Sequence, residues 1–363
     1  MARVLFVEPF YGGSHLAFAD GLDRHSSHEF TFLKLPGEEW RRRMRLGAQQ
    51  LASQANNLHG DFDLVFATDM LDLPAFLALT RPRFASTPVL LYMHENQFTY
   101  PRIRGTKLNS WFGQINYISA LAADHVAFNS EYHRADFLDA LRQLVHQPNN
   151  WLNPEAIEII ERKSSVLPVG VELRWLDELR PTTTTPAPPL ILWNHRWEFD
   201  KAPAMFVRAL QTLTAEGHEF RVAVAGEPGD NPHPALIELP EEMGDRLIQH
   251  GHVDRPEDYG RLLWEADVVV STARHEFFGV SIVEAMYCEC APLLPNGLNY
   301  PHLVPAAQHS VCLYDSEQEF IDKLRNAVLG AELDTGPLRR AATRYDWSTV
   351  AAQCDTAISD LSM

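Results

Sequence analysis

Short apolar runs rich in β-branched residues alternate with amphipathic stretches along most of the chain. Apolar runs bounded by polar turns are typical of buried strands, and stretches with apolar residues three or four positions apart are typical of helices. Because strands and helices alternate, the pattern predicts parallel α/β sheets. The expected strands lie at 4–7, 30–35, 64–67, 89–93 and 125–129, and then at 190–193, 221–225, 248–253, 268–272 and 291–294.

Two such series are expected, one on each side of a stretch without periodicity. Residues 181–189 read PTTTTPAPP, a composition typical of a semi-rigid linker. A chain of 363 residues also fits two domains. We therefore predict a Rossmann-like N-terminal domain at 1–175, a linker at 176–189, a Rossmann-like C-terminal domain at 190–345 and a last helix at 346–363.

The stretch STARHEFFGVSIVE, residues 271–284, is the centre of the predicted chemistry. It reads as the end of a buried strand, a turn with Glu276, and a helix with Glu284. The first helical N–H groups, near Phe278, Gly279 and Val280, can hold an anion such as a phosphate. With a carboxylate on each side of the anion, this arrangement suits a nucleotide sugar. The alternative is one solvated turn residue and one residue on the helix surface.

Two other turns between a strand and a helix have residues suited to phosphate. Arg196 and Lys201 follow the strand at 190–193 and can clamp a diphosphate, one with a planar fork and one with a point charge. Gly12 and Gly13 follow the first strand and allow a ligand to approach the backbone. The alternatives are surface charges in the first case and a plain tight turn in the second.

Polar residues crowd the end of the strand at 89–93, in the sequence HENQFTYP. His94, Glu95, Asn96 and Tyr100 are candidates for ligand contacts, because α/β folds place ligands at the carboxyl ends of strands. His94 and Glu95 lack the second histidine of a HExxH zinc motif, so no zinc is expected. A structural histidine is the alternative for His94.

A basic cluster is expected on the helix that begins near residue 38. Four arginines in five positions lie beside a tryptophan, namely Trp40, Arg41, Arg42, Arg43 and Arg45. Such a cluster is either a solvated face paired with carboxylates or a contact to an RNA phosphate backbone. The net charge of −17 disfavours nucleic-acid binding by the whole surface, so any RNA contact must be local.

Cellular location is predicted from what the sequence lacks. The four cysteines show no CxxC spacing, which is typical of a reduced cytosolic protein. The chain begins directly with a strand, without a signal-peptide pattern, and no apolar run approaches the roughly 18 residues that span a bilayer. We expect a cytoplasmic protein with no membrane partner and no obligate protein partner.

The two glutamates around the FG turn, between a buried strand and an EAM helix, resemble the donor motif of retaining family-4 glycosyltransferases. This resemblance implies the GT-B fold, in which two Rossmann-like domains face a central cleft and the last helix crosses back to the first domain. It implies that Glu276 contacts the sugar, Glu284 holds the ribose, and Arg196 and Lys201 bind the diphosphate without a metal or cofactor.

The same resemblance places further residues at the donor. His94 is expected against the transferred sugar, Gly12 and Gly13 against the donor phosphates and the acceptor, and His252 near the nucleobase. His94, Glu276, Arg196 and Lys201 are then the expected catalytic residues.

Four segments of the first half indicate a narrower group. PFYGGSH, WRRRMR, FATDMLDLPAF and YMHENQFTYP resemble the tRNA-queuosine α-mannosyltransferase family. That resemblance implies transfer of mannose from GDP-mannose to queuosine in the anticodon of an aspartate tRNA. Bases of single-stranded RNA loops can stack on aromatic side chains, and Trp40, Phe98 and Tyr100 are the candidates for such stacking. Other readings stay open: another nucleotide sugar with a small-molecule or glycan acceptor, a non-catalytic nucleotide-sugar-binding protein, or a hydrolase or epimerase of nucleotide sugars.

Overall fold

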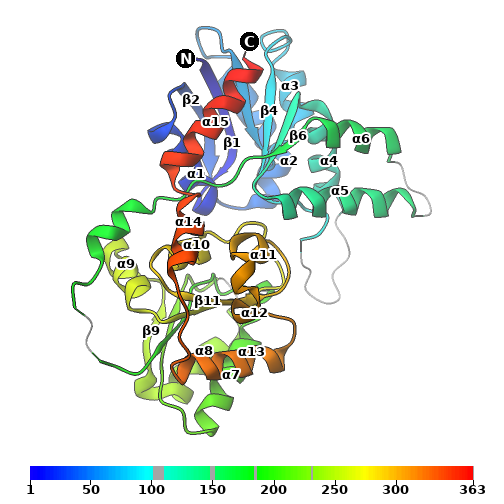
Figure 1. Cartoon of the computed structure of the whole chain (residues 1–363). Coiled ribbons are helices and arrows are strands. Elements are labelled where there is room, and N and C mark those ends of the chain that lie inside the picture. Colours follow the sequence, from blue (N-terminus) through cyan, green and yellow to red (C-terminus); the bar gives the residue numbers. More distant parts are fainter. Residues whose placement is uncertain (101–109, 148–151, 184–185, 230–231, 363) are drawn as a thin grey trace. The chain divides into compact units, whose positions relative to one another are not determined.

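The computed structural model describes residues 1–100, 110–147, 152–183, 186–229 and 232–362 (Figure 1). The chain forms two compact units. Unit 1 consists of Met1–Gly170 together with Trp347–Met363, and unit 2 consists of Val171–Asp346. Each unit is built on a parallel sheet of six strands, as the alternating pattern predicts.

The sheet of unit 1 has the strand order β2-β1-β3-β4-β5-β6, and all its neighbouring strands are parallel. Its central strands β3 and β4 are buried along their whole length, as expected where helices cover both faces. The strands are β1 (Arg3–Tyr11), β2 (Glu29–Pro36), β3 (Leu64–Thr68), β4 (Val89–Met93), β5 (His125–Phe128) and β6 (Ser164–Val166).

Helices cover both faces of this sheet. On one face α1 (Gly13–His25) packs against α15 (Trp347–Leu361), the last helix of the chain (Figure 1). The helices of the other face contact one another in a series. They are α2 (Trp40–Ala55), α3 (Leu73–Leu79), α4 (Ser110–Ala122), α5 (Glu131–Val145) and α6 (Pro154–Arg162).

Trp347 attaches the last helix to unit 1. Its indole is almost fully buried, and two glycines lie directly against it. A Cβ atom added to Gly21 or Gly170 would lie 2.2 or 2.3 Å from the indole, so neither position has room for a side chain. The packing of α15 therefore depends on two glycines that are distant in sequence.

The sheet of unit 2 has the order β12-β11-β10-β7-β8-β9 and is also parallel. Helices α7, α8 and α13 pack together, and α9, α10 and α14 form a second group. The strands are β7 (Leu190–Trp193), β8 (Arg221–Ala225), β9 (Leu247–Gly251), β10 (Val268–Val270), β11 (Ala291–Pro295) and β12 (Leu313–Tyr314). The main helices are α7 (Pro203–Ala215), α8 (Pro234–Met243), α9 (Pro256–Glu265), α10 (Val280–Tyr287), α13 (Glu317–Val328) and α14 (Gly336–Thr343). The short helices are α11 (Tyr300–Leu303), α12 (His309–Cys312), η1 (Arg174–Leu179), η2 (Phe199–Lys201), η3 (Gly244–Arg246) and η4 (Ala306–Gln308).

The structural division of the chain precedes the expected linker. Residues 174–179 form the short helix η1, which packs on α9 within unit 2. The indole of Trp264 on α9 donates a hydrogen bond to the carbonyl of Leu176 at 2.7 Å. Because of these contacts, unit 2 begins at Val171, and the described residues of the stretch at 181–189 belong to that unit.

Each sheet has a point where the chain reverses its direction of winding. In unit 1 this switch lies between β1 and β3, which are neighbours on the sheet, and in unit 2 it lies between β7 and β10. Loops that follow such strands diverge and leave space at the carboxyl edge, which is where open α/β sheets bind ligands. The loops after β1, β3, β7 and β10 are therefore the natural places for a site.

Two smaller expectations concern cysteines and membranes. All four cysteines are buried free thiols, as the sequence predicts for a reduced protein. No helix in the described part of the chain is both long enough and apolar enough to cross a bilayer.

Candidate functional site

In unit 2, the switch point brings together Lys201 from the loop after β7 and Glu276 from the loop after β10. The Lys201 ammonium donates to the carbonyl of His275 at 2.8 Å and lies 3.4 Å from Oε2 of Glu276 and 3.2 Å from Oδ2 of Asp200. Three acceptors engage all three N–H groups of a lysine. A diphosphate can therefore bind Lys201 by replacing Glu276, whose contact is the longest of the three.

Opposite charges hold this pair in its ionised form. Burial alone would raise the pKa of the Glu276 carboxyl, but the nearby ammonium of Lys201 lowers it below its usual value. Burial likewise opposes the charge of Lys201, while Glu276 and Asp200 raise its pKa. Next to the pair, burial and Lys201 lower the pKa of His195 to about 4, so this imidazole is neutral.

The predicted anion site lies at the start of α10. Gly279 caps the helix with φ of 99°, a left-handed conformation that strongly favours glycine. In the part of the chain that the structure describes, the N–H groups of Gly279, Val280 and Ser281 have no acceptor, while that of Phe278 points to Oε1 of Glu276 at 3.4 Å. Glu276 thus lies beside open N–H groups suited to an anion.

Glu284 lies on α10, one turn beyond this N-terminus, and is half-buried. The hydroxyl of Tyr259 on α9 donates to its Oε2 at 3.0 Å. Burial raises the pKa of Glu284 to about 7, and the hydrogen bond from Tyr259 partly opposes that rise. Tyr259 was not among the residues predicted from sequence, because it lies 25 positions away on another helix.

Two other predicted donor residues lie nearby in sequence but at the surface. The side chain of Arg196 is 62% exposed and forms an ion pair with Glu198 at 3.0 Å. His252 is exposed and directly follows β9. The charge of Arg196 acts on Lys201, where it opposes the rise of the lysine pKa. The part of Arg196 and His252 in a site stays a prediction.

In unit 1, His94 lies at the carboxyl end of β4 and is tightly held. Its backbone N–H donates to Oδ1 of Asp69 at 2.8 Å, and its carbonyl accepts from Asn129 at 2.9 Å. Its ring lies 4.0 Å from that of His15 and packs edge-on against Phe18. Burial, followed by the charge of His15, lowers the pKa of His94 well below its usual value, so His94 is neutral.

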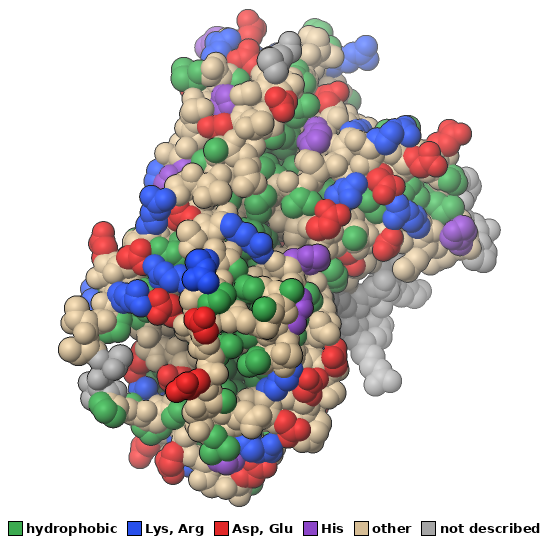
Figure 2. Space-filling view, in the orientation of Figure 1, with side chains coloured by type: hydrophobic (Ala, Val, Ile, Leu, Met, Phe, Trp, Pro, Cys, Tyr) green, Lys and Arg blue, Asp and Glu red, His purple; other side chains and the backbone are tan. Residues whose placement is uncertain are grey.

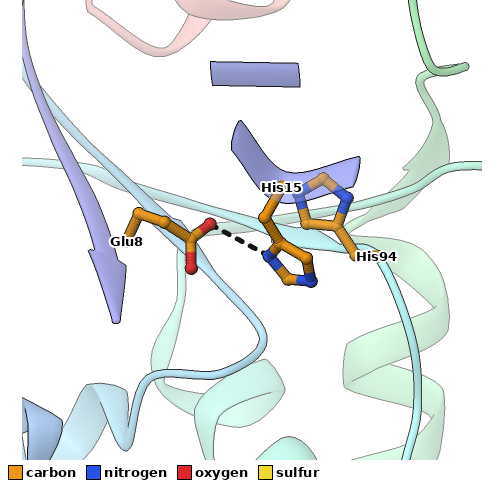
Figure 3. A group of neighbouring side chains, drawn as sticks. All are labelled: Glu8, His15 and His94. Atoms are coloured by element: carbon orange, nitrogen blue, oxygen red, sulfur yellow. Dashed lines mark hydrogen bonds and ion pairs between the residues drawn. The ribbon is translucent and has the colours of Figure 1, made fainter. Parts of the chain in front are cut away.

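Three polar side chains that the sequence analysis did not select surround His94. Nδ1 of His15 lies 3.0 Å from Oε2 of Glu8, and both side chains are buried. Figure 3 marks this contact with a dashed line and shows the ring of His94 beside His15. Burial would lower the pKa of His15, but Glu8 raises it to about 9. Burial raises the pKa of Asp69 to about 7. This cluster lies at the switch between β1 and β3, where the fold favours a ligand.

The same cluster has a donor set that a metal ion could use. One potential ligand atom from each of Glu8, His15 and His94 lies within 4.8 Å of the other two. Both oxygens of Glu8 already have partners, however, because Oε1 accepts from the N–H of Phe10 at 2.8 Å and Oε2 is paired with His15. An ion pair between Glu8 and His15 accounts for one of these contacts, and a backbone N–H accounts for the other. We therefore assign the cluster to hydrogen bonding within the protein and not to a metal ion.

Buried polar atoms without partners gather at both carboxyl edges. Most buried polar groups in proteins are hydrogen-bonded, so each exception needs a reason. Among the described residues, seven of the twelve such side-chain atoms lie at the end of β3 or in the loops that directly follow β3, β4 and β7. They are Oγ1 of Thr68, Oδ2 of Asp69 and Nε2 of His94 in unit 1, and Oδ1 of Asn194, Nε2 of His195, Nε1 of Trp197 and Oδ1 of Asp200 in unit 2. Binding of a polar ligand at these edges would explain the pattern.

The other predicted contacts of unit 1 differ in character. Asn96 is buried, and its amide accepts from the N–H groups of Phe98 and Thr99 and donates to Asp136, so it orders its own loop. Glu95 and Tyr100 are half-buried in that loop. After β1, Gly12 packs directly against Gly37, where its added Cβ would lie 3.0 Å from the Cα atom of Gly37.

The arginines of α2 are mostly exposed, and few of them pair with acids. Arg42 lies 3.1 Å from Glu39, and Arg43 donates to the carbonyl of Pro36. Arg41 instead lies over the ring of Trp40 at 4.6 Å, and Arg45 lies over Phe112 at 5.2 Å.

These residues border a surface depression of about 510 Å³, lined by Glu39, Trp40, Arg41, Arg42, Arg45 and Leu46. Elsewhere, basic and acidic side chains are interspersed on the face that Figure 2 shows. In the described part of the chain, Arg41 and Arg45 form no ion pair with a carboxylate. The arginines of α2 are therefore not all neutralised by carboxylates among the described residues.

Known proteins resemble this chain in both halves. Residues 3–171 match the model of a family described as tRNA-queuosine α-mannosyltransferase N-terminal, and residues 177–343 match glycosyl transferases group 1. The tRNA-queuosine α-mannosyltransferase of Drosophila melanogaster is 34% identical over 336 residues, which cover 89% of this chain and 86% of that protein. The GDP-mannose:cellobiosyl-diphosphopolyprenol α-mannosyltransferase of Xanthomonas oryzae pv. oryzae is 24% identical over 284 residues, 77% of this chain and 69% of that protein.

Among solved structures, sucrose-phosphate synthase from Thermosynechococcus elongatus has a TM-score of 0.74 at 12% identity, and the match covers 99% of both chains. At this identity the likeness concerns the fold alone. It confirms the predicted fold class, with two parallel α/β sheets as in GT-B glycosyltransferases.

Proposed function

The chain belongs to the tRNA-queuosine α-mannosyltransferase family and is a glycosyltransferase, and on this premise we propose that it moves mannose from GDP-mannose to queuosine in the anticodon of tRNA(Asp). The bond between C1 of mannose and the β-phosphate oxygen breaks, and a bond between C1 and a queuosine hydroxyl oxygen forms. The hydroxyl proton leaves with the GDP product. The configuration at C1 is retained.

The observation that supports this proposal best is the pairing of Lys201 with Glu276 beside the open N–H groups at the start of α10. Negative charge builds on the departing diphosphate, and preorganised donors stabilise such charge strongly. Lys201, Arg196 and the amides at Gly279 and Val280 supply those donors. Glu276, displaced from Lys201 by the phosphate, then becomes an acceptor for sugar hydroxyls.

Unit 1 supplies one group that we assign to the transferred sugar and others that we assign to the acceptor. His94 is neutral and has a buried Nε2 without a partner, so it can exchange a hydrogen bond with a hydroxyl of the transferred sugar. The depression on α2 offers exposed guanidinium groups and an indole for an RNA loop, in which bases stack on aromatic side chains. We place the protein in the cytoplasm, where tRNA is modified.

We propose that the diphosphate charge is neutralised by these protein groups and that no metal ion or other cofactor takes part. The rate of transfer should therefore be the same with and without EDTA. A strict requirement for an added divalent cation would contradict this part of the proposal.

A donor panel tests the proposed reaction. GDP-mannose, GDP-fucose, UDP-glucose and UDP-galactose are each incubated with the protein and queuosine-containing tRNA(Asp), and sugar bound to RNA is measured. Thermal unfolding with each donor reports binding independently, because a ligand of the folded state raises its apparent stability. We expect that, among these donors, only GDP-mannose raises the unfolding temperature and also yields RNA-bound sugar. Transfer from a UDP-sugar, or donor hydrolysis that tRNA does not affect, would contradict the proposal.

A further inference from the structure

A chain of hydrogen bonds in unit 2 ends at Glu284. Nδ2 of Asn194, directly after β7, donates to the hydroxyl of Tyr259 on α9 at 3.2 Å. That hydroxyl donates to Oε2 of Glu284 on α10 at 3.0 Å. The same amide of Asn194 donates to the carbonyl of Ser281 at 3.0 Å, in the first turn of α10. The chain thus connects three elements around the carboxyl edge of the sheet.

The chemistry of the groups fixes the direction of this chain. An amide nitrogen donates only, so the oxygen of Tyr259 must accept from Asn194. The single proton of the phenol is then directed to Glu284. Burial raises the pKa of Tyr259 well above its usual value, so this proton stays on the phenol. The contact therefore holds one carboxylate oxygen in a fixed direction.

The other oxygen of Glu284 is available to a ligand. Within the described residues, Oε1 makes no hydrogen bond, and the side chain is only half-buried. Oδ1 of Asn194 is also without a partner although it is buried. A carboxylate whose plane is fixed can accept one hydroxyl on each oxygen, which matches two adjacent hydroxyls of a ribose better than a freely rotating side chain does.

We propose that Tyr259 and Asn194 are positioning residues that hold Glu284 for both hydroxyls of the donor's ribose, so that the protein discriminates ribonucleotide from 2′-deoxyribonucleotide donors. This inference rests on the proposed function, because it assumes that the nucleotide of the donor binds at Glu284. A 2′-deoxy nucleotide leaves one acceptor of the fixed carboxylate unsatisfied, which weakens its binding. Without Tyr259, the carboxylate can turn and the discrimination should be lost.

The experiment measures dissociation constants of GDP and 2′-deoxy-GDP by calorimetry at one fixed pH. For the unchanged protein we expect GDP to bind tighter by on the order of ten- to a hundredfold, the size of one hydrogen bond to a charged group. Tyr259→Phe should weaken the binding of GDP by a similar factor and leave the binding of 2′-deoxy-GDP nearly unchanged. The ratio of the two dissociation constants then approaches one. Asn194→Asp, which offers an acceptor in place of the donor, should act in the same direction.

Tyr314→Phe is the matched control. Its hydroxyl donates to the carbonyl of Ser271 at 2.8 Å in the same unit, whereas the described hydrogen bond to the Glu284 side chain comes from Tyr259. We expect Tyr314→Phe to keep the ratio of dissociation constants that the unchanged protein shows. Thermal unfolding tests whether each variant is folded. A Tyr259→Phe protein that is folded and keeps the full ratio overturns the inference.

If the proposed donor is wrong, the same experiment gives a different result, so the two failures can be told apart. In that case the unchanged protein binds neither guanine nucleotide but binds another one. The same ratio is then measured with that nucleotide and its 2′-deoxy form. A ratio that falls in Tyr259→Phe supports the positioning role, and a ratio that does not fall overturns it.

Discussion

Among single residues, Glu276 offers the most direct test of the site in unit 2. It can lose its charge without leaving Lys201 unpaired, because Asp200 and the carbonyl of His275 still contact that ammonium. Lys201 itself is a poorer target. It is buried between two carboxylates, and removing one partner of a buried ion pair typically costs about 3–5 kcal/mol of stability.

We therefore predict that Glu276→Gln lowers kcat by about 10²–10³, the usual effect of removing one preorganised polar contact. Thermal unfolding should change little. Glu317→Gln is the control, because Glu317 pairs with Arg208 on the surface of the same unit. Steady-state kinetics decide the matter, and a kcat near that of the unchanged protein would show that Glu276 lies outside the site.

A second residue-scale prediction concerns pH and Glu284. Burial raises its pKa to about 7, and the groups facing it, Tyr259 and the Cys288 thiol, stay uncharged because burial raises their pKa values as well. Only the ionised carboxylate can accept both ribose hydroxyls. GDP-mannose should therefore bind more tightly as pH rises from about 6 to about 8, by at most tenfold per unit for one proton.

The stability of the ligand-free protein should respond in the opposite direction. The folded state holds the Glu284 proton more tightly than the unfolded chain does, so this group's contribution to the unfolding free energy falls as pH rises from about 4.5 to about 7. Calorimetric titrations at several pH values measure the affinity. Glu284→Gln should remove its pH dependence, and an affinity of the unchanged protein that is flat across this range would contradict the assignment.

At the scale of elements, helix α2 is predicted to bind RNA through exposed arginines. Arg41 and Arg45 are the suitable pair, because they contact rings and no carboxylate among the described residues. The double change Arg41→Gln and Arg45→Gln should raise the KM for tRNA and reduce the slope of log affinity against log salt by about two, one for each lost phosphate contact. The dissociation constant of GDP-mannose should not change.

The control for this test is the double change Arg142→Gln and Arg162→Gln on α5 and α6, where both arginines pair with acids. It removes the same charge from another surface of unit 1. If both double variants weaken tRNA binding equally, the effect is one of net charge and α2 has no special role.

The last helix is the other element with a testable contact. Trp347→Ala removes an indole that packs between Gly21 and Gly170, and should cost about 3–5 kcal/mol of unfolding free energy, as for other large core side chains. Trp111→Ala, at a tryptophan that is 56% exposed in the same unit, should change stability by less than about 0.5 kcal/mol. Denaturant titrations give both values. Equal effects would show that α15 is not part of the core of unit 1.

The elements themselves were largely predictable, because the periodicity of buried strands and amphipathic helices is a local signal. The strand at 89–93 was predicted at its observed bounds, and the helix after Gly279 within one residue. Strand β1 runs on to Tyr11, beyond the expected 4–7, and Glu8 lies fully buried within it, paired with His15. A charged residue inside a strand reads as a turn when its partner is unknown.

At the scale of the whole molecule, strand order brings together residues whose contacts could not be predicted from the sequence. Glu8, His15 and Asp69 meet His94 only because β1, β3 and β4 are neighbours in the sheet. Tyr259 reaches Glu284 only because α9 packs on α10. Local motifs indicated Lys201, Glu276 and Glu284, but the partners of these residues come from long-range packing.

Net charge also acts at this scale. A protein with a net charge of −17 repels RNA in general. Binding of the proposed acceptor therefore requires a local basic surface and recognition of a specific modified base. A glycosyltransferase with the same fold and donor but a small-molecule acceptor would share every feature of unit 2.

The most direct test is mass spectrometry of nucleosides from tRNA(Asp) after incubation with the protein and GDP-mannose. Two otherwise identical tRNAs are compared, one with queuosine and one with guanosine at the wobble position. We predict that queuosine gains the mass of one mannose residue in the first tRNA, and that the second tRNA is unchanged. Absence of mannosyl-queuosine, while the protein transfers mannose to another acceptor or to both tRNAs equally, would contradict it.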